Sequence, residues 1–141
     1  MAVELWDVLV AAHDGTLATI KRDGRPQLSD VTYLAQRAPG LIRISTREPL
    51  AKVRNLRRDP RASLHARATA GHGYVVADGI ASFSEPAKDV HDAAVDELVE
   101  VYRTIRGEHP DWDEYRRVMV EDNRVVLRIE VERVYGWHME V

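Results

Sequence analysis

The chain has 141 residues, of which 45% are apolar and 30% are charged, and its net charge is −3 at pH 7. This length and composition predict one soluble globular domain over residues 1–141, and the lack of cysteine excludes disulfide bonds and thiolate chemistry. No apolar run is long enough to span a membrane, and acidic Glu4 and Asp7 stand where a signal peptide carries basic residues, so we expect a cytoplasmic protein.

The apolar pattern predicts six strands interrupted by helices. In chain order the expected elements are a helix over residues 3–12, strands over 16–21, 27–35 and 41–45, a helix over 49–58, strands over 61–68 and 74–84, a helix over 90–105, a helix opened by Asp111, and a final strand over 124–137. In the strand 27–35, alternation puts Val31 and Tyr33 on one face and Leu28 on the other. The absence of regular βα alternation favours a closed or nearly closed antiparallel barrel with added helices.

Residues 45–61, STREPLAKVRNLRRDPR, concentrate positive charge in a chain that is acidic overall. The basic residues of this segment are Arg47, Lys52, Arg54, Arg57, Arg58 and Arg61. Ser45 and Thr46 are expected to cap the helix, with Pro49 in its first turn, and a capped helix start after a strand is suited to binding a phosphate. The segment therefore predicts an anionic ligand. The alternatives are a salt-bridged, solvated helix and a nucleic-acid surface, although the acidic pI and the lack of a nucleic-acid-binding motif disfavour the latter.

The rest of the chain shows no pattern typical of another chemistry. The histidines do not pair at metal-ligand spacing, and GxSxG, GxxxxGK and GxGxxG sequences are absent. We therefore expect no metal site and no catalytic side chain. Tyr74 and Trp137 are large apolar groups that suit a core or a subunit interface, and Gly136 would permit a ligand or another backbone to approach the last strand closely.

Several segments together resemble the actinobacterial deazaflavin-dependent reductases, which belong to the split β-barrel superfamily of pyridoxamine 5′-phosphate oxidase. The segments are LATIKRDGRPQLSDVTY, REPLAKVRNLRRDPRASL, GYVVADGIASFSEPA and a C-terminal RVYG, in this order over residues 15–136. The resemblance implies a mainly β, FMN-binding-like split β-barrel with added helices. It also implies a homodimer with cofactor sites at its interface and coenzyme F420, a deazaflavin with a phosphate and an oligoglutamate tail, as the cofactor.

The resemblance further implies which residues bind that cofactor. Lys52 and Asn55 would contact the phosphate, Ser45 and Thr46 would line the ring and the ribityl chain, and residues 26–29 would pack along the deazaflavin. The arginines that are candidates for the acidic tail are Arg54, Arg57 and Arg58. The full set of expected cofactor-binding residues is Pro26, Gln27, Leu28, Ser29, Ile44, Ser45, Thr46, Lys52, Arg54, Asn55, Arg58, Tyr74 and Trp137.

The implied function is a reductase that transfers a hydride from reduced coenzyme F420 to an electron-poor conjugated substrate. The alternatives are an FMN-dependent enzyme similar to pyridoxamine-phosphate oxidase and a non-catalytic F420-binding or carrier protein. Flavin-binding oxidases of the superfamily carry an arginine and a lysine on the second strand, and this chain has Ser29 and Leu34 nearby instead, which disfavours FMN. Close relatives often have a basic residue at the position of Leu50, a difference that bears on phosphate binding. They also often have a tryptophan at the position of His72, so we expect a different substrate pocket.

Overall fold

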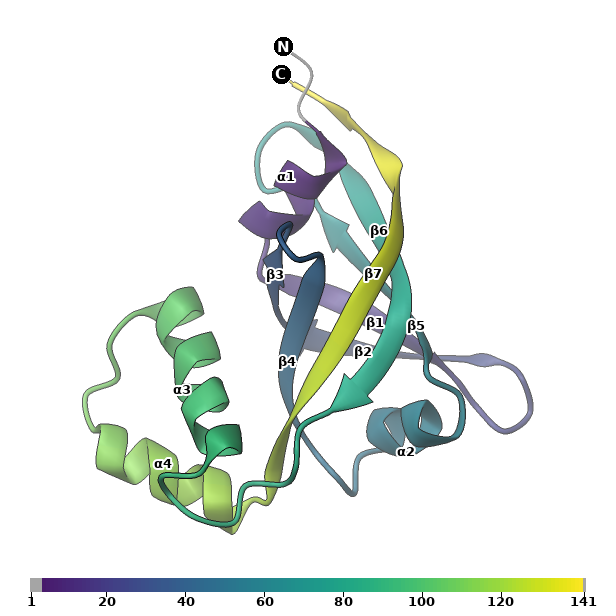
Figure 1. Ribbon diagram of the computed structural model, residues 1–141. Coiled ribbons are helices and arrows are strands. Elements are labelled where there is room, and N and C mark those ends of the chain that lie inside the picture. The colour runs from purple at the N-terminus through teal and green to yellow at the C-terminus, as the bar shows by residue number, and fades with distance from the viewer. Residues whose placement is uncertain (1–3, 141) are drawn as a thin grey trace.

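The computed structural model describes residues 4–140 and shows a mainly β fold with four helices in this range (Figure 1). In chain order the elements are α1 (Leu5–Ala11), β1 (Asp14–Ile20), β2 (Pro26–Thr32), β3 (Leu34–Gln36), β4 (Leu41–Arg47), α2 (Ala51–Arg58), β5 (Arg61–Arg67), β6 (His72–Phe83), α3 (Ala93–Arg106), α4 (Trp112–Glu121) and β7 (Arg124–Met139). The predicted order of helices and strands is confirmed, with seven strands in place of six. The first residue of the expected helix 3–12 lies outside the described residues.

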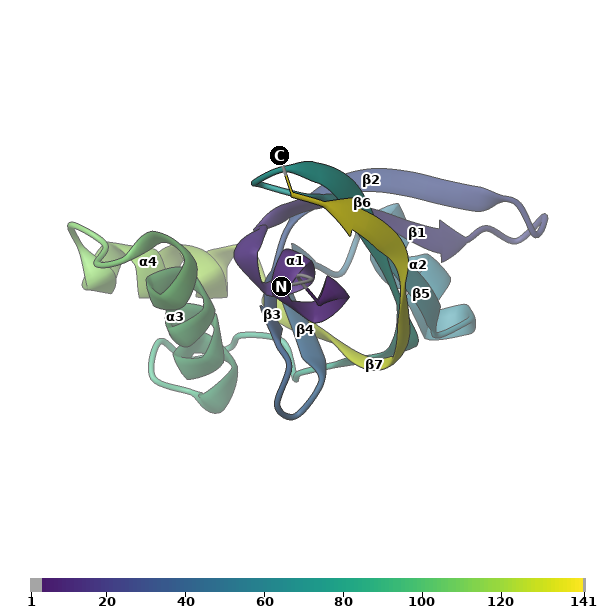
Figure 2. The same cartoon turned by 90° about the horizontal axis from the view of Figure 1, so that it is seen from above.

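The seven strands form one antiparallel sheet in the order β2-β1-β5-β6-β7-β4-β3. Figure 2 shows this sheet curled into a ring, with α1 lying inside the ring at one end. The two edge strands, β2 and β3, follow one another in the chain, separated by Tyr33 alone, so the backbone itself brings the two edges of the sheet together. The fold is therefore the expected split β-barrel with added helices.

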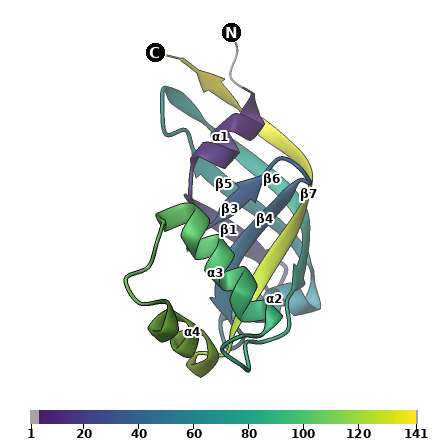
Figure 3. The same cartoon turned by 60° about the vertical axis from the view of Figure 1, so that its left-hand side comes forward.

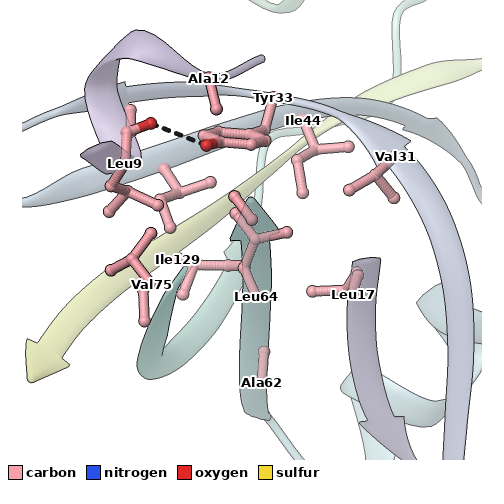
Figure 4. Packing of buried hydrophobic residues seen from close by; sticks show 14 of the residues in the cluster. Leu9, Ala12, Leu17, Val31, Tyr33, Ile44, Ala62, Leu64, Val75 and Ile129 are labelled. Atoms are coloured by element: carbon pink, nitrogen blue, oxygen red, sulfur yellow. Dashed lines mark hydrogen bonds between the residues drawn. The ribbon is translucent and has the colours of Figure 1, made fainter. Parts of the chain in front are cut away.

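The barrel interior is filled by inward-facing strand residues and by α1 (Figure 4). Leu17, Leu64 and Ile129 are fully buried, as is Tyr33. The Tyr33 hydroxyl donates a hydrogen bond of 2.7 Å to the Leu9 carbonyl and so fastens α1 to the sheet. Burial, and to a lesser extent the charge of Asp14, raise the pKa of Tyr33, so this hydroxyl remains a donor.

The prediction of one strand over residues 27–35 is wrong, because the structure divides it into β2 and β3. β2 pairs with β1, whereas β3 pairs with β4 on the other edge of the sheet. The Tyr33 N–H donates to the His13 carbonyl at 2.7 Å at the point where the pairing partner changes. The predicted alternation is confirmed, since Val31 and Tyr33 are buried and Leu28 is 64% exposed.

The start of α2 also differs from the prediction. Ser45 and Thr46 lie in β4 and pair with β7, so their backbone is extended and they do not cap the helix. α2 begins at Ala51 after Leu50, without a side-chain cap, and Pro49 precedes the helix. The strong pairing of β4 with β7 therefore overrides the local capping signal.

The helices α3 and α4 form a helical hairpin on one side of the barrel (Figure 3). The Asp111 carboxylate accepts a hydrogen bond of 3.1 Å from the Glu114 N–H, which confirms the predicted start of α4. A second apolar cluster, separate from the barrel core, packs the hairpin together and against Val126 of β7. Within residues 4–140, none of the helices combines the length and the apolar character needed to cross a membrane.

An ion-pair network fastens α3 to the barrel wall. Glu97 of α3 accepts a hydrogen bond of 3.0 Å from Arg128 Nε, and Arg43 Nη1 lies 3.6 Å from the Glu97 carboxylate. Arg43 Nη2 also donates to Gln36 at 3.0 Å and to Glu100 at 3.1 Å. The side chains of Arg43 and Glu97 are only 7% and 14% exposed, so the hairpin is held in place by largely buried charges.

Replacing Asp92 by alanine is expected to lower the free energy of unfolding by about 1 kcal/mol, because Asp92 caps α3. Its carboxylate accepts hydrogen bonds from the N–H groups of Lys88, Asp89 and Val95 at 2.8, 3.0 and 2.9 Å. Burial raises the pKa of Asp92, but these donors outweigh it and lower the pKa below its usual value.

The contribution of Asp92 should therefore be complete above the unfolded-state pKa of about 3.9 and be lost as the pH falls through the lowered native pKa. Urea denaturation of the wild type and of Asp92→Ala, at neutral and at acidic pH, measures it. Equal stability of the two proteins at neutral pH would contradict the capping role.

Candidate functional site

The cations of the basic segment do not lie together. Lys52 lines a recess between the barrel and the α3–α4 hairpin, whereas Arg54 and Arg58 line a separate hollow beside the turn between β1 and β2. The Arg57 guanidinium lies 4.4 Å from the centre of the Phe83 ring and pairs with Glu48, so it lines neither site. The sequence predicts a single anion-binding surface, but the structure divides these cations between two separate surfaces.

The hairpin recess, as we call the first of these, has a volume of about 420 Å³. Its apolar wall comes from the two helices and consists of Leu98, Val101, Tyr102, Ile105, Tyr115 and Met119. The opposite wall is formed by residues 30–32 of β2 and by Ile44 and Ser45 of β4. Three cations complete the lining: Lys52, Arg106 and Arg124. The recess thus combines an apolar helical wall with positive charge.

Lys52 and Arg124 place two like charges in a partly buried site. Burial, and then the charge of Arg124, lower the pKa of Lys52 below its ordinary value. Within residues 4–140 Lys52 forms no ion pair, and the Asp122 carboxylate lies 3.6 Å from Arg124 Nε. Arg124 Nε is buried without a hydrogen-bond acceptor among the described residues, and its Nη1 lies 3.5 Å from Ser45 Oγ. A bound anion would satisfy these donors and relieve the repulsion between the two cations.

The second surface, the basic hollow, has a volume of about 320 Å³ and is lined by Lys21, Arg22, Gln27, Ala51, Arg54, Asn55 and Arg58. No carboxylate contributes to this lining. The Asn55 amide donates to Thr19 Oγ1 at 3.1 Å and to Gln27 Oε1 at 2.7 Å, so both of its hydrogens are used within the protein. Arg58 Nη2 donates to the Ile20 carbonyl at 2.6 Å. Asn55 and Arg58 thereby tie α2 to the first two strands.

The hairpin recess adjoins one further hollow, which in turn adjoins another. The first, of about 660 Å³, shares residues 30–32 with the recess. The second, of about 490 Å³, shares His65 and Arg67 with the first and extends to Tyr74 and Trp137. We call these two hollows the outer groove. Together with the recess they form a succession of depressions from the cations at Lys52 to the aromatic residues at the end of β7.

The aromatic end of the outer groove is built on paired strands. The rings of His65 and Tyr74 stack with their centres 5.3 Å apart, and Trp137 pairs with Tyr74 across β6 and β7. A Cβ on Gly136 would lie 2.2 Å from the Tyr74 carbonyl oxygen, and its φ of +143° is one that other residues rarely adopt. The expected close approach at Gly136 is therefore an approach of the neighbouring backbone.

The residues that the sequence predicts for the cofactor site fall into separate places. Those in the hairpin recess are Ile44, Ser45 and Lys52. Those in the basic hollow are Gln27, Arg54, Asn55 and Arg58. Those in the outer groove are Tyr74 and Trp137. Those that line none of these hollows are Pro26, Leu28, Ser29 and Thr46.

The sequence did not predict that Arg124 and the helices α3 and α4, which are far from Lys52 in the chain, line the same recess. Arg124 opens β7 and reaches Lys52 because β7 pairs with β4 next to α2. The helical wall was predicted as two helices, but its position over the recess depends on the ion pairs of Glu97 with Arg43 and Arg128. The only local signal for Arg124 was a cation at the start of the last strand.

A curled antiparallel sheet of this topology with added helices belongs to the split β-barrel class. The family model described as pyridoxamine 5′-phosphate oxidase matches residues 4–138, and the chain belongs to this family.

Solved structures with the same fold differ in what their names state. A conserved hypothetical protein from Mycobacterium tuberculosis is 27% identical, with a TM-score of 0.71 over 97% of this chain and 86% of that protein. An F420 reductase is 14% identical, with a TM-score of 0.73 over 96% of this chain and 98% of that protein. A heme-binding protein from Mycobacterium smegmatis is 21% identical, with a TM-score of 0.68 over 94% of this chain and 51% of that protein.

Proposed function

We propose that this protein is an F420-dependent oxidoreductase that transfers a hydride from reduced deazaflavin to an electron-poor conjugated substrate. The observation that carries the proposal is the pair Lys52 and Arg124, two cations that line a cavity next to a long groove. A phosphate on an otherwise planar, extended cofactor suits this arrangement. The F420 reductase with the same fold adds support for this class of cofactor.

The side chains present fit such a cofactor in the following way. Lys52 would bind the phosphate, with Ser45 as a neutral donor beside it. Arg54 and Arg58, in the basic hollow without carboxylates, would attract the oligoglutamate tail. When bound, the deazaflavin supplies the hydride, and the protein supplies position and electrostatics. A contact between Asn55 and the phosphate would require its amide to leave Gln27 or Thr19.

The remaining candidates would complete the site from the sheet and from a second subunit. Pro26, Leu28 and Ser29 of β2 would pack along the deazaflavin, and Thr46 would lie behind Ser45. A homodimer would bring the exposed face of β7 onto the partner. The large apolar residues exposed there are Tyr135, Trp137 and Met139, at 46%, 48% and 58%. Light scattering at micromolar concentration tests the dimer, and a monomer mass with cofactor bound would contradict it.

Two alternatives remain for the same fold. The first alternative is an FMN-dependent enzyme similar to pyridoxamine-phosphate oxidase, in line with the description of the family. The second is a non-catalytic F420-binding or carrier protein, and a neighbour described as heme-binding has the same fold. Parallel fluorescence titrations with coenzyme F420 and with FMN distinguish an F420-dependent protein from an FMN-dependent one. We expect the deazaflavin to bind more tightly than FMN. Tighter binding of FMN, or no binding of the deazaflavin, would overturn the proposal.

The affinity for a long-tailed deazaflavin is expected to fall more steeply with added salt than the affinity for an analogue without the tail. The reason is that the tail would add several exposed charge interactions with Arg54 and Arg58, which salt screens. Titrations of both ligands at several ionic strengths measure the two slopes. Equal slopes would mean that the basic hollow does not bind the tail.

We expect His72→Ala and Tyr74→Phe each to retain more than about a tenth of the turnover, a barrier change below about 1.4 kcal/mol. Hydride transfer to a conjugated alkene leaves an oxyanion that needs a donor. His72 is exposed at the end of β6 and the Tyr74 ring is stacked on His65, so water or backbone N–H groups are the preferred donors. Turnover measured at saturating cofactor checks this. A thousandfold loss with unchanged cofactor affinity would identify a side-chain acid.

A further inference from the structure

The hairpin recess contains an apolar surface that neither a phosphate nor an oligoglutamate tail uses. Tyr102, Ile105 and Tyr115 keep partly exposed surface in the recess. Behind them, the lining is completed by apolar residues that are already buried, Leu98, Val101, Met119 and Ile44. Apolar surface that faces an open cavity gains free energy when an apolar ligand covers it. The volume of about 420 Å³ lies within the range typical of small-molecule sites. The recess is therefore large enough for an apolar body in addition to an anionic group.

We propose that the hairpin recess binds an amphipathic anion, with a carboxylate or phosphate head between Lys52 and Arg124 and an apolar body against α3 and α4. The head would accept from the Lys52 ammonium, from the Arg124 guanidinium and from the Ser45 hydroxyl, which all line the recess. This head would use the same two cations as the proposed coenzyme phosphate, so the two ligands would compete for the recess. The proposal is argued from the lining of the recess and is tested without coenzyme.

The apolar wall is held in place before any ligand binds. The Tyr115 hydroxyl donates to the Leu98 carbonyl at 3.1 Å, and the ring centres of Tyr102 and Tyr115 lie 5.0 Å apart. The ion pairs of Glu97 with Arg43 and Arg128 fix α3 against the barrel. A rigid wall reduces the cost of ordering side chains on binding, which favours a specific ligand over loose adsorption.

The charge balance selects an anion over a neutral or cationic apolar ligand. Lys52, Arg106 and Arg124 line the recess, and Asp30, which is exposed on β2, is the one carboxylate among the described residues that line it. Lys52 has no ion pair among the described residues, and Arg124 has the Asp122 carboxylate at 3.6 Å, so a neutral ligand would bury a net positive charge. An anionic head removes this penalty. The chemical class is thus an apolar acid.

The test uses anilinonaphthalene sulfonate, a fluorescent apolar anion, on the full chain without coenzyme. Octanoate should displace the probe at a concentration at least about tenfold lower than octanol or acetate, because octanol lacks the charge and acetate the apolar body. Equal displacement by octanoate and octanol, or by octanoate and acetate, would overturn the proposal. Absence of probe binding would overturn it as well.

Two variants in the recess and one control variant outside it test whether octanoate binds there. Arg124→Gln should weaken octanoate binding about tenfold and leave octanol unchanged. Ile105→Asn, on the partly exposed wall, should weaken both ligands and remains informative if Arg124→Gln fails to fold by circular dichroism. Arg57→Gln removes a cation of α2 that lines neither site and should change neither ligand. Octanoate affinity within about twofold of the wild type in both Arg124→Gln and Ile105→Asn would refute the site.

A separate titration with coenzyme F420 keeps the two proposals apart. Octanoate binding without coenzyme binding would refute the proposed function and leave this site standing. Coenzyme binding without selective octanoate binding would refute this site alone.

Discussion

Replacing Glu97 by alanine is expected to lower the free energy of unfolding by about 3–5 kcal/mol, the range for removing one partner of a buried ion pair. Glu97 is 14% exposed and accepts from Arg128, and it faces Arg43, which is 7% exposed. Arg43 Nε already lacks a hydrogen-bond partner among the described residues. The variant would leave Arg43 with only the exposed Glu100 to balance its charge, and α3 would lose the ion pairs of Glu97 with β4 and β7.

Urea denaturation of the variant measures this loss, and Glu100→Ala is the matched control. Glu100 belongs to the same network on the same helix, but its side chain is 59% exposed, so its removal should cost less than about 1 kcal/mol. A loss below about 1 kcal/mol for Glu97→Ala, or equal losses for both variants, would show that burial does not set the strength of this network.

Replacing Lys52 by alanine is expected to weaken the binding of coenzyme F420 about ten- to a hundredfold. A charge-assisted hydrogen bond from an ammonium to a phosphate is worth about 1.5–3 kcal/mol, and each 1.4 kcal/mol is a factor of about ten in affinity. Arg124 would remain in the recess, so binding should be weakened and not abolished. The sequence marks Lys52 by its place in the basic segment, and the structure places it in a partly buried recess.

Fluorescence titration of the variant measures the effect, with Lys88→Ala as the control. Lys88 carries the same charge but is exposed on the segment before α3 and lines none of the hollows described above. Unchanged affinity for Lys52→Ala, or an equal loss for Lys88→Ala, would remove Lys52 from the site and with it the assignment of the recess to the phosphate.

The sequence predicted most of the fold because its strands and helices carry strong periodic patterns. Apolar alternation in β2 and the Asp111 cap of α4 were correctly read from local residues. The errors lie where long-range pairing overrides a local signal. Ser45 has the side chain of a helix cap, but it lies in a strand because the pairing of β4 with β7 continues to Arg47. The strand predicted over 27–35 is divided at Tyr33 because the pairing partner changes there from β1 to β4.

The candidate site was predictable only in part, for the same reason. A resemblance that matches motif to motif could indicate Lys52 and Asn55, since they lie on one short helix. It could not reveal that the Asn55 amide is engaged by Thr19 and Gln27, or that Arg124 lies beside Lys52, because these contacts join residues far apart in the chain. The apolar wall of the recess depends on how α3 and α4 pack, which no local pattern encodes.

Hydride transfer by this protein is tested by single-turnover oxidation of reduced coenzyme F420 with an excess of a conjugated enone, in the presence and in the absence of the protein. We expect the deazaflavin absorbance to recover much faster when the protein is present at saturating concentration, and this acceleration to shrink at sub-saturating Lys52→Ala. Bound coenzyme that is oxidised no faster than free coenzyme, across a panel of enones and quinones, would contradict the proposed function and leave a protein that binds the cofactor without catalysing hydride transfer.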